Sequence, residues 1–256
     1  MTQYERASLY LSGIAVVISV AIPLVQFIYH KIQRPRLHII PFDGQPLTLS
    51  FDTFGPYAWF RFSIQCENES CIVKTIKLSI CRANGESLYS AKWVLLKPIH
   101  VNRMFADVQH ATIDTSTLVH PIRIGAGKLE PLNVEFEASV SANHHNLIQK
   151  LQAAVGSACL ASQNADEVLM DQSVSSAIDE LGKSCPWLEG DYTAEITILY
   201  DAAGSIARQY GFSITSDQAA ALSDNAIALA SALLPAGYPG MRKQFQNPSF
   251  DVSTKE

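Results

Sequence analysis

The chain has 256 residues, of which 48% are hydrophobic and 17% are charged. This composition is typical of a folded globular protein and excludes an intrinsically disordered chain. The formal net charge of −5 argues against a nucleic-acid partner, because nucleic-acid-binding proteins usually present a basic face.

The first predicted element is an uncharged, mainly apolar stretch of 23 residues from Ala7 to Tyr29. About 20 apolar helical residues cross the hydrocarbon core of a bilayer. A cleaved signal peptide would need a basic amino-terminal region, and here Glu5 offsets Arg6. A buried core helix is rarely uncharged over this length. The sequence therefore predicts a single-pass transmembrane anchor, with residues 1–36 as the anchor and its basic flank.

The charges on either side of this stretch predict its orientation. Arg6 precedes it, whereas Lys31, Arg34 and Arg36 follow it. Because the more basic flank of a membrane helix tends to stay in the cytoplasm, we expect a protein of the cell membrane with a cytoplasmic C-terminal domain. The lipid bilayer is then a partner of residues 7–29.

From residue 37 onward the hydrophobic pattern changes to a period of two. Apolar and polar residues alternate in short segments separated by turns, as in antiparallel strands with one buried and one exposed face. Such a succession predicts a β-sandwich. The segments are residues 47–52, 60–66, 75–80, 88–96 and 132–140, and a hairpin follows over residues 188–215.

The stretch from Leu188 to Tyr192, with the sequence LEGDY, resembles the start of strand F in immunoglobulin-like domains. In that fold a tyrosine at this place bonds back to the backbone and forms a tyrosine corner. The resemblance implies an antiparallel immunoglobulin-like β-sandwich. It does not imply the disulfide of antibody domains, because Ala194 stands where they carry a cysteine. Resemblance of fold does not carry function.

About fifty residues separate Val140 from Tyr192, although only a short corner would be needed there. Apolar residues recur at helical spacing in this interval, and Asn164 with Glu167 resembles a capping box. We expect a helical hairpin, the insert 143–187, within a domain that spans residues 37–235. The two predicted stripes are Ile148, Leu151, Val155 and Ala158, and then Met170, Val174, Ile178 and Leu181.

A C-terminal helix is predicted from Thr215, where Thr-Ser-Asp-Gln resembles another capping box, to about Leu234. Proline and glycine residues end it. We expect residues 236–256 to form a flexible tail. The predicted fold is thus mainly β with α elaborations: a transmembrane helix, a sandwich, a helical insert and a C-terminal helix.

Histidine and cysteine residues match no catalytic or metal-binding motif. His144 and His145 are adjacent, and neighbouring helical residues do not face one another, so we interpret them as solvated turn residues. His100, His110 and His120, with Asp107 and Asp114 between them, lack the spacing of metal ligands. Zinc sites usually combine two close pairs, and Cys66, Cys71 and Cys81 have no second pair. In a reducing cytoplasm, Cys159 and Cys185 are expected to be thiols.

We therefore predict no catalytic, cofactor-binding or metal-binding residue and no cofactor. The predicted function is that of a membrane-anchored, non-enzymatic interaction protein with a protein partner. Two alternatives stay open: a ligand-binding sensor or effector that forms homo-oligomers through its membrane helix, and a membrane-anchored hydrolase. An enclosed polar pocket between sandwich and insert would favour the sensor. The candidate partner contacts are Trp59 and Trp187, provided that they are exposed, and Asp171, Asp179 and Glu180.

Overall fold

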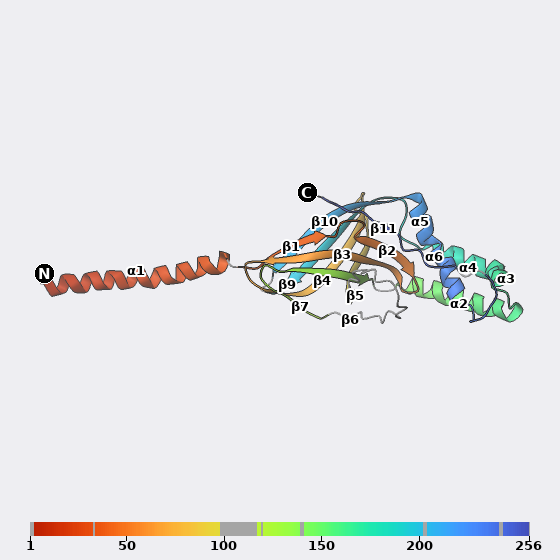
Figure 1. Ribbon diagram of the computed structural model, residues 1–256, viewed down its shortest axis with the longest axis horizontal. Helices are drawn as coiled ribbons and strands as arrows, with labels where there is room; N and C mark the ends of the chain where they lie inside the picture. Colours follow the sequence, from red (N-terminus) through yellow and green to blue (C-terminus); the bar gives the residue numbers. More distant parts are fainter. Residues whose placement is uncertain are drawn as a thin grey trace, which may run out of the picture.

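The computed structural model describes residues 3–32, 34–97, 117–118, 120–138, 141–201, 204–240 and 243–255. Figure 1 shows helix α1 (Gln3–Ile32) projecting from one end of a β body, with the other helices at the opposite end. His100, Asp107, His110, Asp114 and Val140 lie outside the described residues.

The β body is an antiparallel sheet that follows the predicted alternation. Its path is β11-β2-β3-β8-β5-β4-β9-β10-β12, and β1, β6 and β7 pair with β3, β5 and β4 respectively. The longer strands are β1 (Arg36–Pro41), β2 (Leu47–Asp52), β3 (Gly55–Glu67), β4 (Cys71–Arg82), β5 (Ser87–Lys97), β8 (Leu129–Glu137), β9 (Gly190–Tyr200) and β10 (Gly204–Ile214). The short ones are β6 (Thr117–Leu118), β7 (Ile122–Ile124), β11 (Ser249–Phe250) and β12 (Ser253–Thr254).

The sheet folds over so that its two halves enclose one core. Strands β3 and β10 are not neighbours in the sheet, yet the rings of Phe60 and Tyr210 have centroids 5.5 Å apart. The pairing of β5 with β4 joins the two halves along one side. Buried residues alternate along β9, where Tyr192, Ala194 and Ile196 are all at most 1% exposed. The prediction of a mainly β, antiparallel fold is confirmed.

The insert between β8 and β9 is helical, as predicted, but it contains a break. It forms α2 (Ala142–Ala161), α3 (Ala165–Met170) and α4 (Gln172–Lys183). The expected continuous second helix is interrupted at Asp171, whose carboxylate accepts hydrogen bonds from the backbone of Ser173 and Val174 and so starts a new helix. Met170 is 81% exposed, so its assignment to the buried stripe is wrong.

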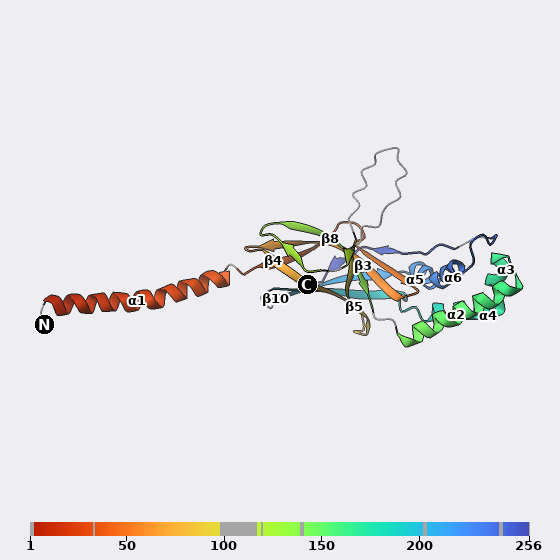
Figure 2. The same ribbon diagram turned by 90° about the horizontal axis from the view of Figure 1, so that it is seen from below.

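The C-terminal helix is also divided. It consists of α5 (Ser216–Ser223) and α6 (Asn225–Ala232). The predicted capping box is present, because Thr215 and Gln218 each accept the other's backbone N–H. Figures 1 and 2 both show α2 to α6 beyond one end of the strands rather than spread over a sheet face.

The prediction of a flexible tail is wrong for residues 249–254. Strand β11 pairs with β2, and β12 pairs with β10, so the tail lies along both edges of the sheet. Phe250 is 3% exposed and packs against Phe212. Asn225 further holds the tail by exchanging two hydrogen bonds with the backbone of Gln246.

Side chains of α1 are described at Tyr4 and at residues 14–28. Within the described part of the chain, no helix has both the length and the apolar character needed to cross a membrane. The transmembrane anchor therefore stays a prediction.

Candidate partner-binding cleft

A cleft lies at the helical end, where the insert meets the C-terminal helices. Its volume is about 480 Å³. Helix α4 forms one wall, α5 and the start of α6 form the other, and the corner that leads into β9 closes the base. The lining residues that matter below are Asp179, Gly182, Lys183, Cys185, Trp187 and Leu188 from the insert and its exit, and Ser223, Asp224 and Ile227 opposite them.

Gly182 lets the two walls approach closely. The hydroxyl of Ser223 donates a hydrogen bond to the carbonyl oxygen of Gly182 over 3.1 Å. A Cβ atom at Gly182 would lie only 2.9 Å from the Ser223 Oγ atom, so any larger residue would push α4 and α5 apart. Glycine at this position therefore sets the width of the cleft.

Trp187 and Cys185 form the floor. The indole Nε1 of Trp187 donates to the carbonyl oxygen of Ser50 on β2 over 3.0 Å, and its ring packs on Tyr89 at 5.6 Å. Burial raises the pKa of the Cys185 thiol to about 12. That thiol stays protonated at neutral pH, so it is a small apolar floor group rather than a nucleophile.

The rim is exposed and mainly acidic. Asp179, Lys183 and Asp224 are exposed, and Leu188 is 52% exposed. Helices α2 to α6, together with the capping residues Asp171 and Asp224, carry seven Asp or Glu residues and two lysines, which is a net charge of −5. The cleft therefore combines an apolar floor with an acidic rim.

The predicted contact residues divide between the cleft and other places. Asp179 lies on the rim, whereas Glu180 pairs with Lys150 over 2.6 Å and Asp171 caps α4. Trp187 is 1% exposed, so it does not meet the condition of exposure set for a partner contact. Trp59 is half-buried on β3, outside the cleft, and donates to Glu135 Oε2 over 2.9 Å. The contribution of Ser223 and Asp224 was missed, because no sequence signal places α5 against α4.

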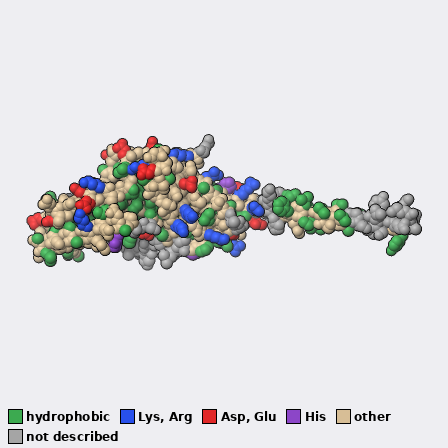
Figure 3. Space-filling view, turned by 180° about the vertical axis from the view of Figure 1, so that it is seen from behind, with side chains coloured by type: hydrophobic (Ala, Val, Ile, Leu, Met, Phe, Trp, Pro, Cys, Tyr) green, Lys and Arg blue, Asp and Glu red, His purple; other side chains and the backbone are tan. Residues whose placement is uncertain are grey.

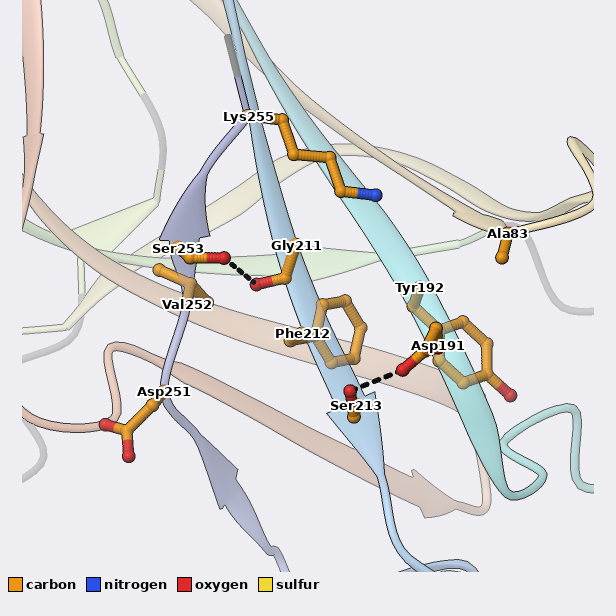
Figure 4. A pocket seen from close by; sticks show the side chains of 10 residues that line it. All are labelled: Ala83, Asp191, Tyr192, Gly211, Phe212, Ser213, Asp251, Val252, Ser253 and Lys255. Atoms are coloured by element: carbon orange, nitrogen blue, oxygen red, sulfur yellow. Dashed lines mark hydrogen bonds between the residues drawn. The ribbon is translucent and has the colours of Figure 1, made fainter.

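A larger hollow lies where the tail crosses the sheet, with a volume of about 580 Å³ (Figure 4). Its polar side chains are engaged with the protein itself. Ser213 donates to Asp191, and Lys255 Nζ donates to Thr193 Oγ1. The carboxylate of Asp251 accepts from the backbone of Gln45. These contacts fix the tail to β9, β10 and the β1–β2 loop, and they explain the polar character of the hollow without a ligand.

A third cavity, of about 280 Å³, surrounds His144 at the start of α2. The interpretation of His144 as a solvated turn residue is wrong, because it is 5% exposed. Its Nε2 atom lies 2.9 Å from the backbone oxygen of Asp52, and its ring packs edge-on against Phe51. Burial, with Glu137 and Glu135 nearby, raises the pKa of Asp52 to about 6. The imidazole contacts the backbone of Asp52 rather than its carboxylate, so the pair links α2 to the β2–β3 turn.

His145, in contrast, is exposed, as predicted, and contacts Gln149 over 2.9 Å. All five cysteines are free thiols. Among the residues that the structure describes, no group of three or more His, Cys, Asp or Glu side chains is placed to hold a metal ion.

Comparison with known proteins adds no further constraint: no family model matches the chain, and no curated protein matches it. The function must therefore be argued from the geometry of the described residues.

Proposed function

We propose that this is a single-pass, membrane-anchored, non-enzymatic interaction protein whose helical end binds a protein partner. The observation that carries the proposal is the separation of the two ends. Helix α1 leaves one end of the β body, and the cleft with its acidic rim lies at the other (Figure 1). A partner bound there is held away from the membrane surface by the length of the body.

The proposal of an anchor rests on the sequence of α1, in which residues 7–29 carry no charge. Its 30 residues extend over about 45 Å, against roughly 30 Å for the hydrocarbon core of a bilayer. Its described apolar side chains are exposed on all sides of the helix, and a helix that is apolar all round suits an apolar environment. The exposed residues are Ile14, Val16, Val17, Ile18, Val20, Ile22, Leu24, Val25, Phe27 and Ile28.

We further propose that the body is an immunoglobulin-like sandwich in the cytoplasm. The order β2-β3-β8-β5 and then β4-β9-β10 corresponds to A-B-E-D and C-F-G of that fold. The hydroxyl of Tyr192 donates to the carbonyl oxygen of Leu188 over 2.6 Å, which is the bond of a tyrosine corner. The cytoplasmic placement is supported by Lys31, Arg34 and Arg36 after the span.

The position of Asp179 and Glu180 supports partner binding by the helical end. Both lie in the C-terminal half of α4 (Gln172–Lys183), where negative charge opposes the helix dipole. Glu180 pairs with Lys150 of α2, whereas Asp179 forms no ion pair among the described residues. A basic surface on the partner, with an apolar side chain that enters the cleft between α4 and α5, complements them.

Site-specific photo-crosslinking in the full-length protein tests this function. A photoreactive residue replaces Leu188 at the cleft rim, and a matched one replaces the exposed Ile40 on β1, at the α1 side of the body. In native membranes we expect the Leu188 position to crosslink a discrete protein and the Ile40 position not to do so. Equal labelling at both positions, or no protein adduct at position 188, would contradict the proposal.

Protease accessibility tests the orientation. Protease added to intact cells stripped of their outer layers should leave residues beyond 40 uncut. Digestion of those residues while the membrane remains sealed would place the body on the outer side.

A ligand-binding sensor is the second candidate, because the cleft volume lies in the range of small-molecule sites. The two functions differ in what fills the cleft. Replacing Gly182 with Leu would push the two walls apart and change the shape of the cleft. A loss of small-molecule binding with intact protein crosslinking at the rim would favour the sensor.

A further inference from the structure

The end of the body beside α1 carries a surface that combines basic and apolar side chains. Lys128 lies on the turn between β7 and β8, Leu129 is the first residue of β8, and Arg123 lies on β7 directly opposite Ile72 of β4. Leu129 is 55% exposed and Ile72 is 40% exposed. Lys74 is also exposed on β4. These five residues, Ile72, Lys74, Arg123, Lys128 and Leu129, are called the basic–apolar patch below.

The backbone places the patch next to the exit of α1. The amide of Cys66 donates to the carbonyl oxygen of Lys128, and the amide of Gly127 donates to that of Cys66. The following turn reaches the anchor linker, because Asn68 Nδ2 donates to the carbonyl oxygen of Arg34 over 3.2 Å. Arg34 and Arg36 are both exposed there. Figure 3 shows several Lys and Arg side chains on the part of the body that adjoins α1.

The linker leaves little distance between patch and membrane. Helix α1 ends at Ile32 and β1 begins at Arg36. The four Cα–Cα steps from Ile32 to Arg36 span at most about 14 Å when fully extended. If α1 crosses the bilayer, as proposed above, this end of the body is therefore held at the level of the headgroups.

We propose that the basic–apolar patch binds the surface of a bilayer that contains anionic lipids. Within the described residues, none of Arg34, Arg36, Lys74, Arg123 and Lys128 forms an ion pair, so these cations are available to phosphate and carboxylate headgroups. Leu129 and Ile72 enter the interface between headgroups and acyl chains.

Acidic residues at the same end set the strength of this contact. They are Glu67, Glu69, Glu130 and Asp201. Glu67 lies 3.3 Å from His38 Nε2, within β1 and β3 rather than in the patch. The contact is therefore weak on its own, and it acts because α1 holds the patch at the surface. The acidic helical end is at the same time repelled by anionic lipid, which favours an upright body.

Hydrogen exchange of the full-length protein in nanodiscs tests the proposal. One preparation contains phosphatidylcholine alone, and the other also contains phosphatidylserine. We expect the amides of residues 122–130 to exchange at least about fivefold more slowly in the anionic discs. About fivefold is the factor by which one Lys or Arg near an anionic surface raises the membrane-binding constant. High salt should abolish the difference, because it screens exposed charges. Residues 183–189 at the helical end are the internal reference.

The double variant Arg123→Gln/Lys128→Gln should lose the protection. The matched control Lys150→Gln/Lys183→Gln removes the same charge from the helical end and should retain it. All four side chains are exposed, so exchange elsewhere should stay unchanged.

Equal exchange in both discs would overturn the proposal, and so would protection that appears only after a soluble protein is added. A protein that does not incorporate into discs at all would instead contradict the membrane anchor, so the two failures are distinguishable.

Discussion

The two ends of the body differ both in construction and in charge. The end beside α1 consists of turns between strands and exposes Arg34, Arg36, Arg123 and Lys128. The opposite end consists of helices α2 to α6, which with the capping residues Asp171 and Asp224 account for a net charge of −5, equal to that of the whole chain. The remainder of the chain is thus formally neutral. The difference indicates that the helical end supplies the acidic surface of the molecule.

The helical end is nevertheless joined to the core of the β body. Buried residues of α2, α4 and α6 belong to the same continuous cluster as the strands. Trp187 is the largest of the fully buried side chains and bonds to β2. The insert is therefore part of the core, and only its outer surface is proposed to bind a partner.

The largest expected effect comes from Trp187→Ala, which removes a side chain that joins the helical end to strand β2. We expect a loss of about 3–5 kcal/mol in the free energy of unfolding, since the change leaves a large cavity at a buried site. Urea denaturation in detergent, followed by both circular dichroism and fluorescence, should show one transition for both ends.

The matched control is Leu188→Ala, at a neighbouring residue that is 52% exposed. It should change stability by less than about 0.5 kcal/mol. Two separate transitions in the Trp187 variant would mean that the helical end folds independently, and the comparison between the ends would then be one between two domains.

A smaller effect of opposite sign is expected for Asp52→Asn, at the junction of β2 with α2. The pKa of Asp52 is raised from 3.8 to about 6 in the folded protein, mainly by burial. The folded state therefore favours the protonated acid, and stability is lost as pH rises from about 4 through 6. The variant should be more stable than the native protein by about 2 kcal/mol at pH 8 and nearly equal to it at pH 4.

Chemical denaturation at the two pH values measures this difference. Asn keeps a side-chain oxygen that can accept the hydrogen bond from the amide of Phe54. The control Asp43→Asn, on an exposed loop, should change stability by less than about 0.5 kcal/mol. A stabilisation by Asp52→Asn that is the same at both pH values would show that burial of the carboxylate is not its cause.

Tyr192→Phe tests whether strand β9 fixes the rim of the cleft. The Tyr192 hydroxyl donates to the carbonyl oxygen of Leu188 and accepts from its amide over 3.1 Å. We expect a loss of about 1–2 kcal/mol, because both backbone groups lose their partner. Tyr200→Phe, on the same strand, is the control, since the Tyr200 hydroxyl has no hydrogen bond among the described contacts. Equal losses in the two variants would contradict a special role of the corner.

Much of this fold was predictable because its signals are local. The alternation along residues 190–200 and the helical spacing from Ile148 to Ala158 both follow from the period of the element concerned. The bond of Tyr192 was predictable from five residues. In contrast, β11 and β12 have two residues each and show no period, so the docking of the tail left no signal.

The site was less predictable, because it depends on contacts between distant segments. Asp179 could be nominated from the acidic face of one helix. Trp187 is held in the floor by its hydrogen bond to Ser50, and Ser223 is held in the wall by its hydrogen bond to Gly182. The two residues of each pair are far apart in the sequence. His144 was misjudged for the same reason, since its neighbours are on the β2–β3 turn.

The smallest effect on stability is expected for Asp179→Asn/Glu180→Gln. The same variant should have a large effect on partner binding. The ion pair of Glu180 with Lys150 is about half exposed on both sides, and such pairs contribute between about 0 and 1 kcal/mol. Removing two negative charges near the C-terminus of α4 also relieves an unfavourable interaction with the helix dipole. These two contributions oppose each other, so the free energy of unfolding should change by less than about 0.5 kcal/mol.

If the acidic rim binds a basic partner, the same variant should lose most of the protein crosslinking from position 188. Asp166→Asn/Glu167→Gln, at the start of α3, removes the same charge away from the cleft and should leave that crosslinking unchanged. Unaltered crosslinking in the first variant would show that the charge of the helical end has a role other than partner binding.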